Sequence, residues 1–331
     1  MKRREFLGLA GAALISGPKI SIAQTTAGKT LRVVVIANRY HEADGLMAAL
    51  CNQMAHSPYL STPYNVEWPR VPSDPPADSQ KPRCLINVFK NPSDKTVPSA
   101  TMEIWCIDDL ANTKGDSSAK VSAMDKITDY GTAPDGVVAF GTAGYPGLPS
   151  NDGCATIGSA IFIHDAANDF SGPHGGWSWP GYMGTLVQSK TPSSFFSSAG
   201  DPKTLNSISL EMIAPQNHPA SVLQLIIAAD AVGISSVNIP ANAPYCDIDL
   251  NAIAQAKAAG ATNITSVETT HGVIRSKWPD APFIYVTAIP NRVCHFPDEA
   301  QSVYAQEFPS SHNAGVALKH VVPHFVRAIA A

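Results

Sequence analysis

The sequence has little charge, no long apolar run after residue 23 and no closely spaced cysteines. Charged residues make up 15% of its 331 residues and hydrophobic residues 44%, which excludes a disordered chain and is enough for a sizeable core. Beyond residue 23 the net charge is −7, which argues against a nucleic acid or another polyanion as a partner. Because no apolar run there is long enough to cross a bilayer, no membrane span is expected.

The cysteines are six in number and show no CxxC pair, which argues against a zinc ribbon. One or two disulfides and buried free thiols are both compatible with this spacing, and the pairing does not follow from it. The positions are Cys51, Cys84, Cys106, Cys154, Cys246 and Cys294.

The first 23 residues have the pattern of an export leader. Arg3 and Arg4 precede a short, weakly hydrophobic run over residues 6–15, and small residues at 21–23 are suited to cleavage. This pattern resembles a bacterial twin-arginine signal. We therefore expect residues 1–23 to be a signal peptide, residues 24–331 to be the mature protein, and its location to be periplasmic or secreted.

Strands alternate with helices along most of the remaining chain, which predicts an α/β sheet. The apolar, β-branched run at 31–37 (LRVVVIA) is typical of a strand buried on both faces, and GVVAF at 136–140 is another, ending in a glycine turn at 141–144. Further strands are expected at 84–89, 102–107, 234–239, 263–267 and 283–289. Helices are expected at 42–54, 117–130, 219–231, 249–259 and 311–329. No repeat or linker divides the chain, so we expect one domain.

Two segments fit no regular element and are interpreted as insertions. Residues 57–98 hold nine of the 27 prolines, and average usage predicts about two. Residues 166–212 are rich in Gly, Ser, Pro and Trp. Since loops this long are usually functional or disordered, we expect the second insertion to be a lid or a subunit contact.

Several familiar active-site motifs are missing. The GTAG sequence at 141–144 lacks the serine of a GxSxG elbow and the second half of a GxGxxG nucleotide loop. His41, Asp44, His271 and His295 do not have the spacing of a standard metal site. We therefore expect no metal and no cofactor.

Polar residues follow several of the predicted strands, at the sheet edge where open α/β sheets bind ligands. Their order along the chain resembles the nucleoside phosphorylase and nucleosidase superfamily, which cleaves the N-glycosidic bond of nucleosides with phosphate or water. The matching segments are 36–42, 138–144, 157–161, 239–246, 266–271 and 288–291. The resemblance implies a single three-layer α/β/α domain with a central mixed sheet, carrying the two irregular insertions.

The resemblance also implies roles for individual residues. Glu42 corresponds to the carboxylate that orients the attacking water, and Asn291 to the residue that hydrogen-bonds the departing base. Tyr245 corresponds to the aromatic residue that stacks on the base, and Glu268 to the acceptor for the sugar hydroxyls. The other implied ligand-binding residues are Thr142, Gly144, Cys246, Thr269 and Thr270, with Arg39 as the phosphate ligand of a phosphorylase.

The chain departs from the superfamily pattern at two of these positions. Asn291 replaces an aspartate, although 6-oxopurine phosphorylases use asparagine there, and Thr270 replaces a second glutamate. The expected activity is cleavage of purine nucleosides, with hydrolysis slightly preferred over phosphorolysis because Glu42 is suited to orient a water. The expected partners are a nucleoside, phosphate if the reaction is phosphorolysis, and further copies of the chain. An inactive periplasmic nucleoside-binding protein is the alternative, and a hydrolase of a different glycosidic or ester bond comes third.

Overall fold

The apolar run at residues 31–37 forms β1 (Leu31–Ala37), in which every residue after the first is buried. It lies between β3 (Ala100–Cys106) and β4 (Gly136–Tyr145) and runs parallel to both. Alternate β1 residues point into two separate hydrophobic clusters, one on each face of the sheet. Burial on both faces is the reason that the run is continuously apolar.

The computed structural model describes residues 29–51, 79–91, 93, 96–200, 208, 211–216, 223–300 and 302–331. The predicted signal peptide and most of the first insertion lie outside the described residues. The described strands form one sheet of eleven, with a main path β2-β3-β1-β4-β10-β9-β6-β7. The strands not yet given are β2 (Cys84–Val88), β5 (Ala155–Gly158), β6 (Ala160–Asp165), β7 (Leu186–Val187), β8 (Leu225–Ile227), β9 (Ala231–Val237), β10 (Asn263–Glu268) and β11 (Phe283–Arg292).

The sheet branches at β4. The strand pairs in parallel with β1 and β11, and near its end Gly144 pairs antiparallel with Val267 of β10. Beyond β11, β5 and β8 continue the second branch. This branching brings the ends of β1, β4, β10 and β11 together, and the mixture of parallel and antiparallel pairs confirms the predicted mixed sheet.

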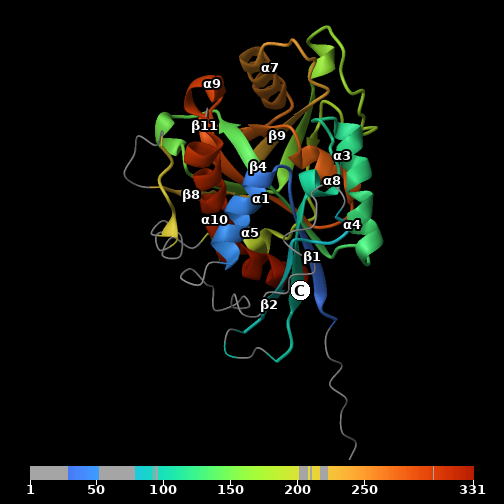
Figure 1. Ribbon diagram of the computed structural model, residues 1–331, viewed down its shortest axis with the longest axis vertical. Coiled ribbons are helices and arrows are strands. Elements are labelled where there is room, and N and C mark those ends of the chain that lie inside the picture. Colours follow the sequence, from blue (N-terminus) through green and yellow to red (C-terminus); the bar gives the residue numbers. More distant parts are fainter. Residues whose placement is uncertain are drawn as a thin grey trace, which may run out of the picture.

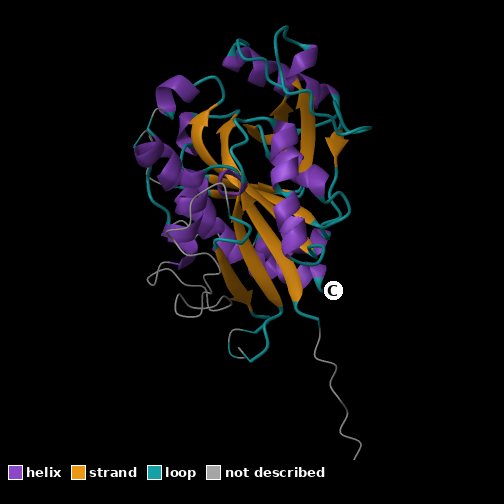
Figure 2. Cartoon of the chain, turned by 45° about the vertical axis from the view of Figure 1, so that its right-hand side comes forward, coloured by secondary structure: helices purple, strands orange, loops and turns teal. Residues whose placement is uncertain are grey.

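Helices cover both faces of the sheet (Figures 1 and 2). The first hydrophobic cluster lies under α1, α5 and α10, and the second lies under α3, α4 and α8. The third cluster lies between α7 and strands β6, β9 and β10. The three-layer α/β/α architecture is therefore confirmed. The helices are α1 (Tyr40–Cys51), α2 (Ile107–Leu110), α3 (Ser117–Ala123), α4 (Asp125–Tyr130), α5 (Ser193–Ala199), α7 (Tyr245–Ala258), α8 (His271–Lys277), α9 (Phe296–Glu299) and α10 (Phe308–Ile329).

Three local predictions were wrong. The expected glycine turn at 141–144 is instead the extended second half of β4, because it pairs with both β11 and β10. The helix expected at 219–231 is replaced, within its described part, by β8 and the start of β9. The single helix expected at 117–130 is two helices, with the break at Met124.

The described part of the second insertion has a few buried side chains, although most of its residues are exposed or half-buried. Trp177 is 7% exposed and joins the second hydrophobic cluster, and its backbone N–H donates to Asn238 Oδ1 at 2.7 Å. Phe195 is fully buried against Phe325 of α10. Because burying a large apolar side chain contributes roughly 2–3 kcal/mol, removing this segment is expected to destabilise the fold.

Two of the six cysteines form a disulfide, Cys246–Cys294, and the other four are free thiols. Within the described chain, no helix is both long and apolar enough to cross a membrane.

Candidate active site

A cavity of about 230 Å³ opens where β1, β4, β10 and β11 end. This is the sheet edge at which α/β proteins bind ligands. Nine of the ten predicted site residues line it, namely Arg39, Glu42, Thr142, Gly144, Tyr245, Glu268, Thr269, Thr270 and Asn291. The lining also contains Asn38, His41, Phe140, Gly141, Ala143, Val267, His271, Pro290, Phe296 and Glu307.

Glu42 is held by four hydrogen bonds. Its Oε2 accepts from the backbone N–H groups of Asn38 and Arg39 at 2.9 and 2.8 Å. Its Oε1 accepts from the N–H and the hydroxyl of Thr142, both at 2.8 Å. A carboxylate offers about four lone-pair sites, so the protein itself fills the acceptor capacity of Glu42. The residue therefore joins the end of β1 to the second half of β4.

Glu268 and His271 form a second buried pair. Oε2 of Glu268 accepts from the backbone N–H groups of Thr270 and His271, the latter at 2.8 Å. Its Oε1 has no hydrogen-bond partner, and neither has His271 Nδ1, which lies 3.9 Å away. Because buried polar atoms are nearly always paired, two facing unpaired atoms mark this wall of the cavity as unusual.

A buried lysine lies behind this wall. Lys120 is 2% exposed, and its Nζ donates to Thr270 Oγ1 at 2.7 Å. Burial lowers the pKa of Lys120 to about 8, while the negative charge of Glu268 opposes this effect. The hydroxyl of Thr270 is thus fixed by a cationic donor that lies on the side away from the cavity.

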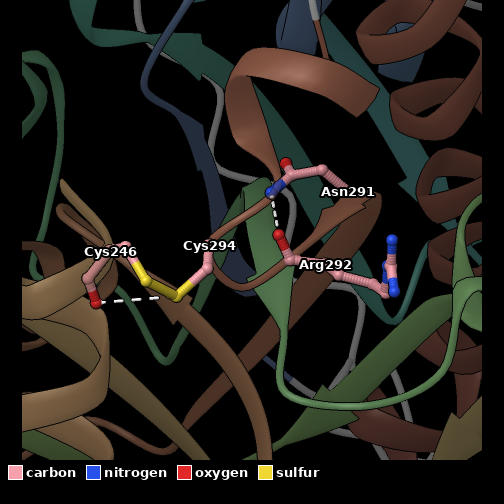
Figure 3. Close-up of a disulfide and its surroundings, with 4 residues drawn as sticks. All are labelled: Cys246, Asn291, Arg292 and Cys294. Carbon is pink, nitrogen blue, oxygen red and sulfur yellow. Dashed lines mark hydrogen bonds between the residues drawn. A yellow bond between two sulfur atoms is a disulfide. The ribbon is translucent and has the colours of Figure 1, made fainter.

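Two aromatic side chains also line the cavity. They are Tyr245 and Phe296, with ring centroids 5.6 Å apart, and together with Asn291 they are called the aromatic end. Asn291 is 3% exposed, and its Nδ2 donates to the carbonyl of Arg292 at 2.7 Å (Figure 3). One amide hydrogen is used in this turn, which leaves the second hydrogen and the carbonyl oxygen for a ligand.

The disulfide stands beside this aromatic end. Cys246 follows Tyr245 at the start of α7, and Cys294 lies three residues after Asn291 (Figure 3). Cys246 is not among the residues lining the cavity, so the structure places it next to the site and not on its surface. Its bond to Cys294 holds the Tyr245 segment against the end of β11.

Two charged pairs border the cavity. His41 Nε2 lies 3.0 Å from Glu307 Oε2. Burial alone lowers the pKa of His41, but its close contact with the Glu307 carboxylate and the charge of Glu42 outweigh burial, and the pKa is raised. Arg39 Nη1 lies 3.6 Å from Asp108, and its half-exposed side chain also lines a neighbouring cavity of about 400 Å³.

Two other kinds of catalytic centre find no support. Among the residues that the structure describes, no group of three or more His, Cys, Asp and Glu side chains is arranged to hold a metal ion.

Ser236, His164 and Asp169 are linked by hydrogen bonds of 3.0 and 2.8 Å, in the order of a catalytic triad. However, His164 is fully buried and Ser236 is 2% exposed, and none of the three lines the main cavity. Gln255 of α7 donates to Asp169, so this network ties α7 to the sheet.

Sequence reasoning missed four residues of the site. His41 and His271 were considered as metal ligands and given no role in catalysis, although each lies within a segment that resembles the superfamily. Phe296 begins the short helix α9 and Glu307 ends a π-helical turn (Val303–Glu307) just before α10, and no motif or periodicity marks either residue.

Comparisons with known proteins agree with the fold. No protein-family model and no curated protein sequence matches the chain. A putative 5′-methylthioadenosine/S-adenosylhomocysteine nucleosidase from Borrelia burgdorferi B31, bound to adenine, is a similar solved structure. It has a TM-score of 0.50 and 10% identity, over 88% of this chain and 98% of that one.

Two other solved structures are similar at slightly lower scores. A nucleosidase of the same kind from Colwellia psychrerythraea 34H has a TM-score of 0.48 and 12% identity, over 91% of this chain and 96% of that one. Futalosine hydrolase of Helicobacter pylori strain 26695 has a TM-score of 0.47 and 12% identity, over 88% of this chain and 97% of that one. The fold is similar to that of the Borrelia burgdorferi protein. At these identities the likeness is one of fold alone.

Proposed function

We propose that the protein cleaves the N-glycosidic bond of purine nucleosides and releases the base, with water preferred over phosphate as the nucleophile. The observation that carries this proposal is the composition of the cavity. Part of its lining consists of two aromatic rings and a buried amide, and another part, called the polar end, consists of carboxylates, hydroxyls and imidazoles. A nucleoside offers a partner for each of these two kinds of group, a flat base and a polar sugar.

The aromatic end is suited to the base. Stacking on Tyr245 would contribute on the order of 1–3 kcal/mol. The free amide hydrogen of Asn291 is available to an acceptor of the purine ring, where negative charge gathers as the C–N bond breaks. Stabilising this charge is the main requirement of the reaction, because the base departs with the bonding electron pair.

The polar end is suited to the sugar and the nucleophile. Glu42 fixes the backbone and hydroxyl of Thr142, and both residues line the cavity with polar atoms. Arg39 is the basic side chain that would bind phosphate if phosphate were the nucleophile.

The direct test is base release from inosine, guanosine and adenosine, each with and without inorganic phosphate. We expect release in phosphate-free buffer and little stimulation by phosphate. Strict dependence on phosphate would replace hydrolysis by phosphorolysis. The absence of release from every nucleoside would exclude the activity.

A second candidate function is nucleoside binding without turnover. It is favoured by the four protein donors that already occupy Glu42, which leave this carboxylate little capacity to activate a water. Saturable binding of inosine by calorimetry, together with no base release, would select this alternative.

A further inference from the structure

The unpaired atoms of Glu268 and His271 point to a group that acts on the nucleophile. Both residues are more than nine-tenths buried and line the cavity. Glu268 Oε1 and His271 Nδ1 face each other across 3.9 Å without any other partner. Catalytic hydrogen bonds are often long in ligand-free proteins and shorten when substrate binds.

The imidazole of His271 is held in one orientation. Tyr285 stacks on it with ring centroids 6.0 Å apart and an interplanar angle of 20°. Its Nδ1 faces Glu268, so its Nε2 is directed to the other side of the ring. Nε2 lies 3.0 Å from the point where a Cβ on Gly141 would stand, and Glu42 Oε1 lies 3.2 Å from the same point. A side chain at Gly141 would therefore intrude between His271 and Glu42.

We propose that His271, oriented by Glu268, is the general base of the reaction, in place of Glu42. This inference rests on the proposed function and assigns water as the nucleophile. A carboxylate–imidazole pair fixes the tautomer with the proton on Nδ1, and Nε2 is then free to accept a proton. Glu42 acts as a positioning residue, since its lone pairs are occupied by the chain itself.

The reaction then proceeds as follows. The water oxygen forms a bond to the anomeric carbon of the sugar, and its proton passes to His271 Nε2. The bond between the anomeric carbon and the base nitrogen breaks, and the base leaves with the electron pair near Asn291. The base takes up a proton from solvent and His271 returns its proton to solvent, so that nucleoside and water give free sugar and base.

Two variants of His271 separate a catalytic role from a packing role. Asparagine keeps a polar atom close to the position of Nδ1, beside Glu268, but has no basic nitrogen in place of Nε2. Alanine removes both and leaves space for added imidazole. The matched control is His320→Ala. His320 lies on α10, hydrogen-bonds Glu211 and does not line the cavity.

The experiment measures kcat and KM for inosine hydrolysis. We expect His271→Ala and His271→Asn each to lower kcat by about 10²–10⁴-fold with little change in KM. Added imidazole should restore part of the rate of His271→Ala, and His320→Ala should keep the wild-type rate. Thermal unfolding checks that each variant is folded, and the asparagine variant serves if the alanine variant is not.

Other results would overturn the inference. A wild-type rate in His271→Asn would show that the residue only supports Glu268, and unchanged kcat in both variants would show that it takes no part. In these cases the proposed function stands, because the wild type still releases base. No base release by the wild type would overturn the proposed function and this inference together.

Discussion

At the scale of single residues, the site is decided by which polar atoms the chain satisfies and which it leaves for a ligand. Glu42 is fully hydrogen-bonded within the protein, whereas Glu268 and His271 each keep one unpaired atom. The resemblance to the superfamily identifies the segments that carry Glu42, which follows the apolar strand β1, and Glu268, which ends β10. It does not reveal this difference in hydrogen bonding, which depends on backbone N–H groups that any sequence has.

Replacing Glu42 tests its positioning role. Glu42→Gln substitutes one acceptor oxygen by an NH₂ group, which would face N–H or O–H donors in the fold. Each buried donor left unpaired costs about 1–3 kcal/mol, so the variant should be less stable by this amount as well as slower. Urea unfolding and base release check the two effects. A variant as stable as the wild type would show that the four hydrogen bonds to the Glu42 carboxylate do not stabilise the fold.

The choice of base is expected to depend on Asn291. Its amide complements the N7 and O6 acceptors of a 6-oxopurine, whereas the 6-amino group of adenine would leave an amide donor unpaired at a cost of about 1–3 kcal/mol. Inosine and guanosine should therefore be better substrates than adenosine by roughly ten- to a hundredfold.

Asn291→Asp should shift this preference toward adenosine, since a protonated acid can donate to N7. The measurement is kcat/KM of the wild type and the variant on inosine and adenosine. A wild type that prefers adenosine, or an unchanged preference in the variant, would show that Asn291 does not select the base.

Lys120 should make stability depend on pH. Its pKa of about 8 lies below the ordinary 10.5 because burial disfavours the charged form. The folded state therefore binds fewer protons than the unfolded state between these values, and stability rises with pH in this window. The full cost, present below pH 8, is about 3 kcal/mol.

Lys120→Met removes this cost and also the hydrogen bond to Thr270, which contributes about 1 kcal/mol. The variant should be more stable than the wild type at pH 7, by about 2 kcal/mol, and lose this advantage by pH 10.5. Urea unfolding at both pH values measures the difference. The same advantage at both would show that Lys120 does not titrate in this range.

At the scale of elements, the sequence predicted the buried strands well and the irregular connections poorly. Apolar β-branched runs such as β1 and β11 leave little ambiguity, because burial on both faces demands them. The GTAG segment has the composition of a turn, yet its pairing with β10 and β11 keeps it extended. Tertiary pairing overrides local propensity here. The missed residue Glu307 precedes a helix whose position depends on packing against α1.

The disulfide joins two elements that carry the aromatic end of the site. Its cysteines are 48 residues apart, so the cross-link is expected to contribute about 4 kcal/mol to stability. Cys246→Ser/Cys294→Ser should lower the unfolding temperature and raise KM for inosine, because the Tyr245 segment is no longer tied to β11. A reductant should have the same effect on the wild type and none on the double variant. A wild-type KM in the double variant would show that the aromatic end holds without the bond.

At the scale of the whole molecule, the predicted single domain and its assembly from several copies stay predictions. The alternation of strands and helices predicted the α/β sheet, and the resemblance to the superfamily implied its three layers. The prediction that the second insertion is a lid or a subunit contact also stays a prediction, although Trp177 and Phe195 within it are buried. Glycine, serine and tryptophan suggest a loop by composition, but sequence alone does not show whether tryptophan and phenylalanine side chains bury their area on the same molecule.

The disulfide and the predicted leader point to the same cellular compartment, and we propose that the protein is exported. Disulfides persist in oxidising compartments, and three of the four free thiols are buried, which protects them from wrong pairing.

In a bacterial host, we expect the wild type in the periplasmic fraction, with Gln24 as its first residue and Cys246 bonded to Cys294. Changing both Arg3 and Arg4 to lysine should keep the protein in the cytoplasm, because the export machinery recognises the twin arginines. Cys246 and Cys294 should then be reduced, because the cytosol is reducing. Fractionation, N-terminal sequencing and mass spectrometry after thiol alkylation measure all three properties. Export of the lysine variant at the wild-type level would refute the twin-arginine route, and an uncleaved wild type in the cytoplasm would refute export itself.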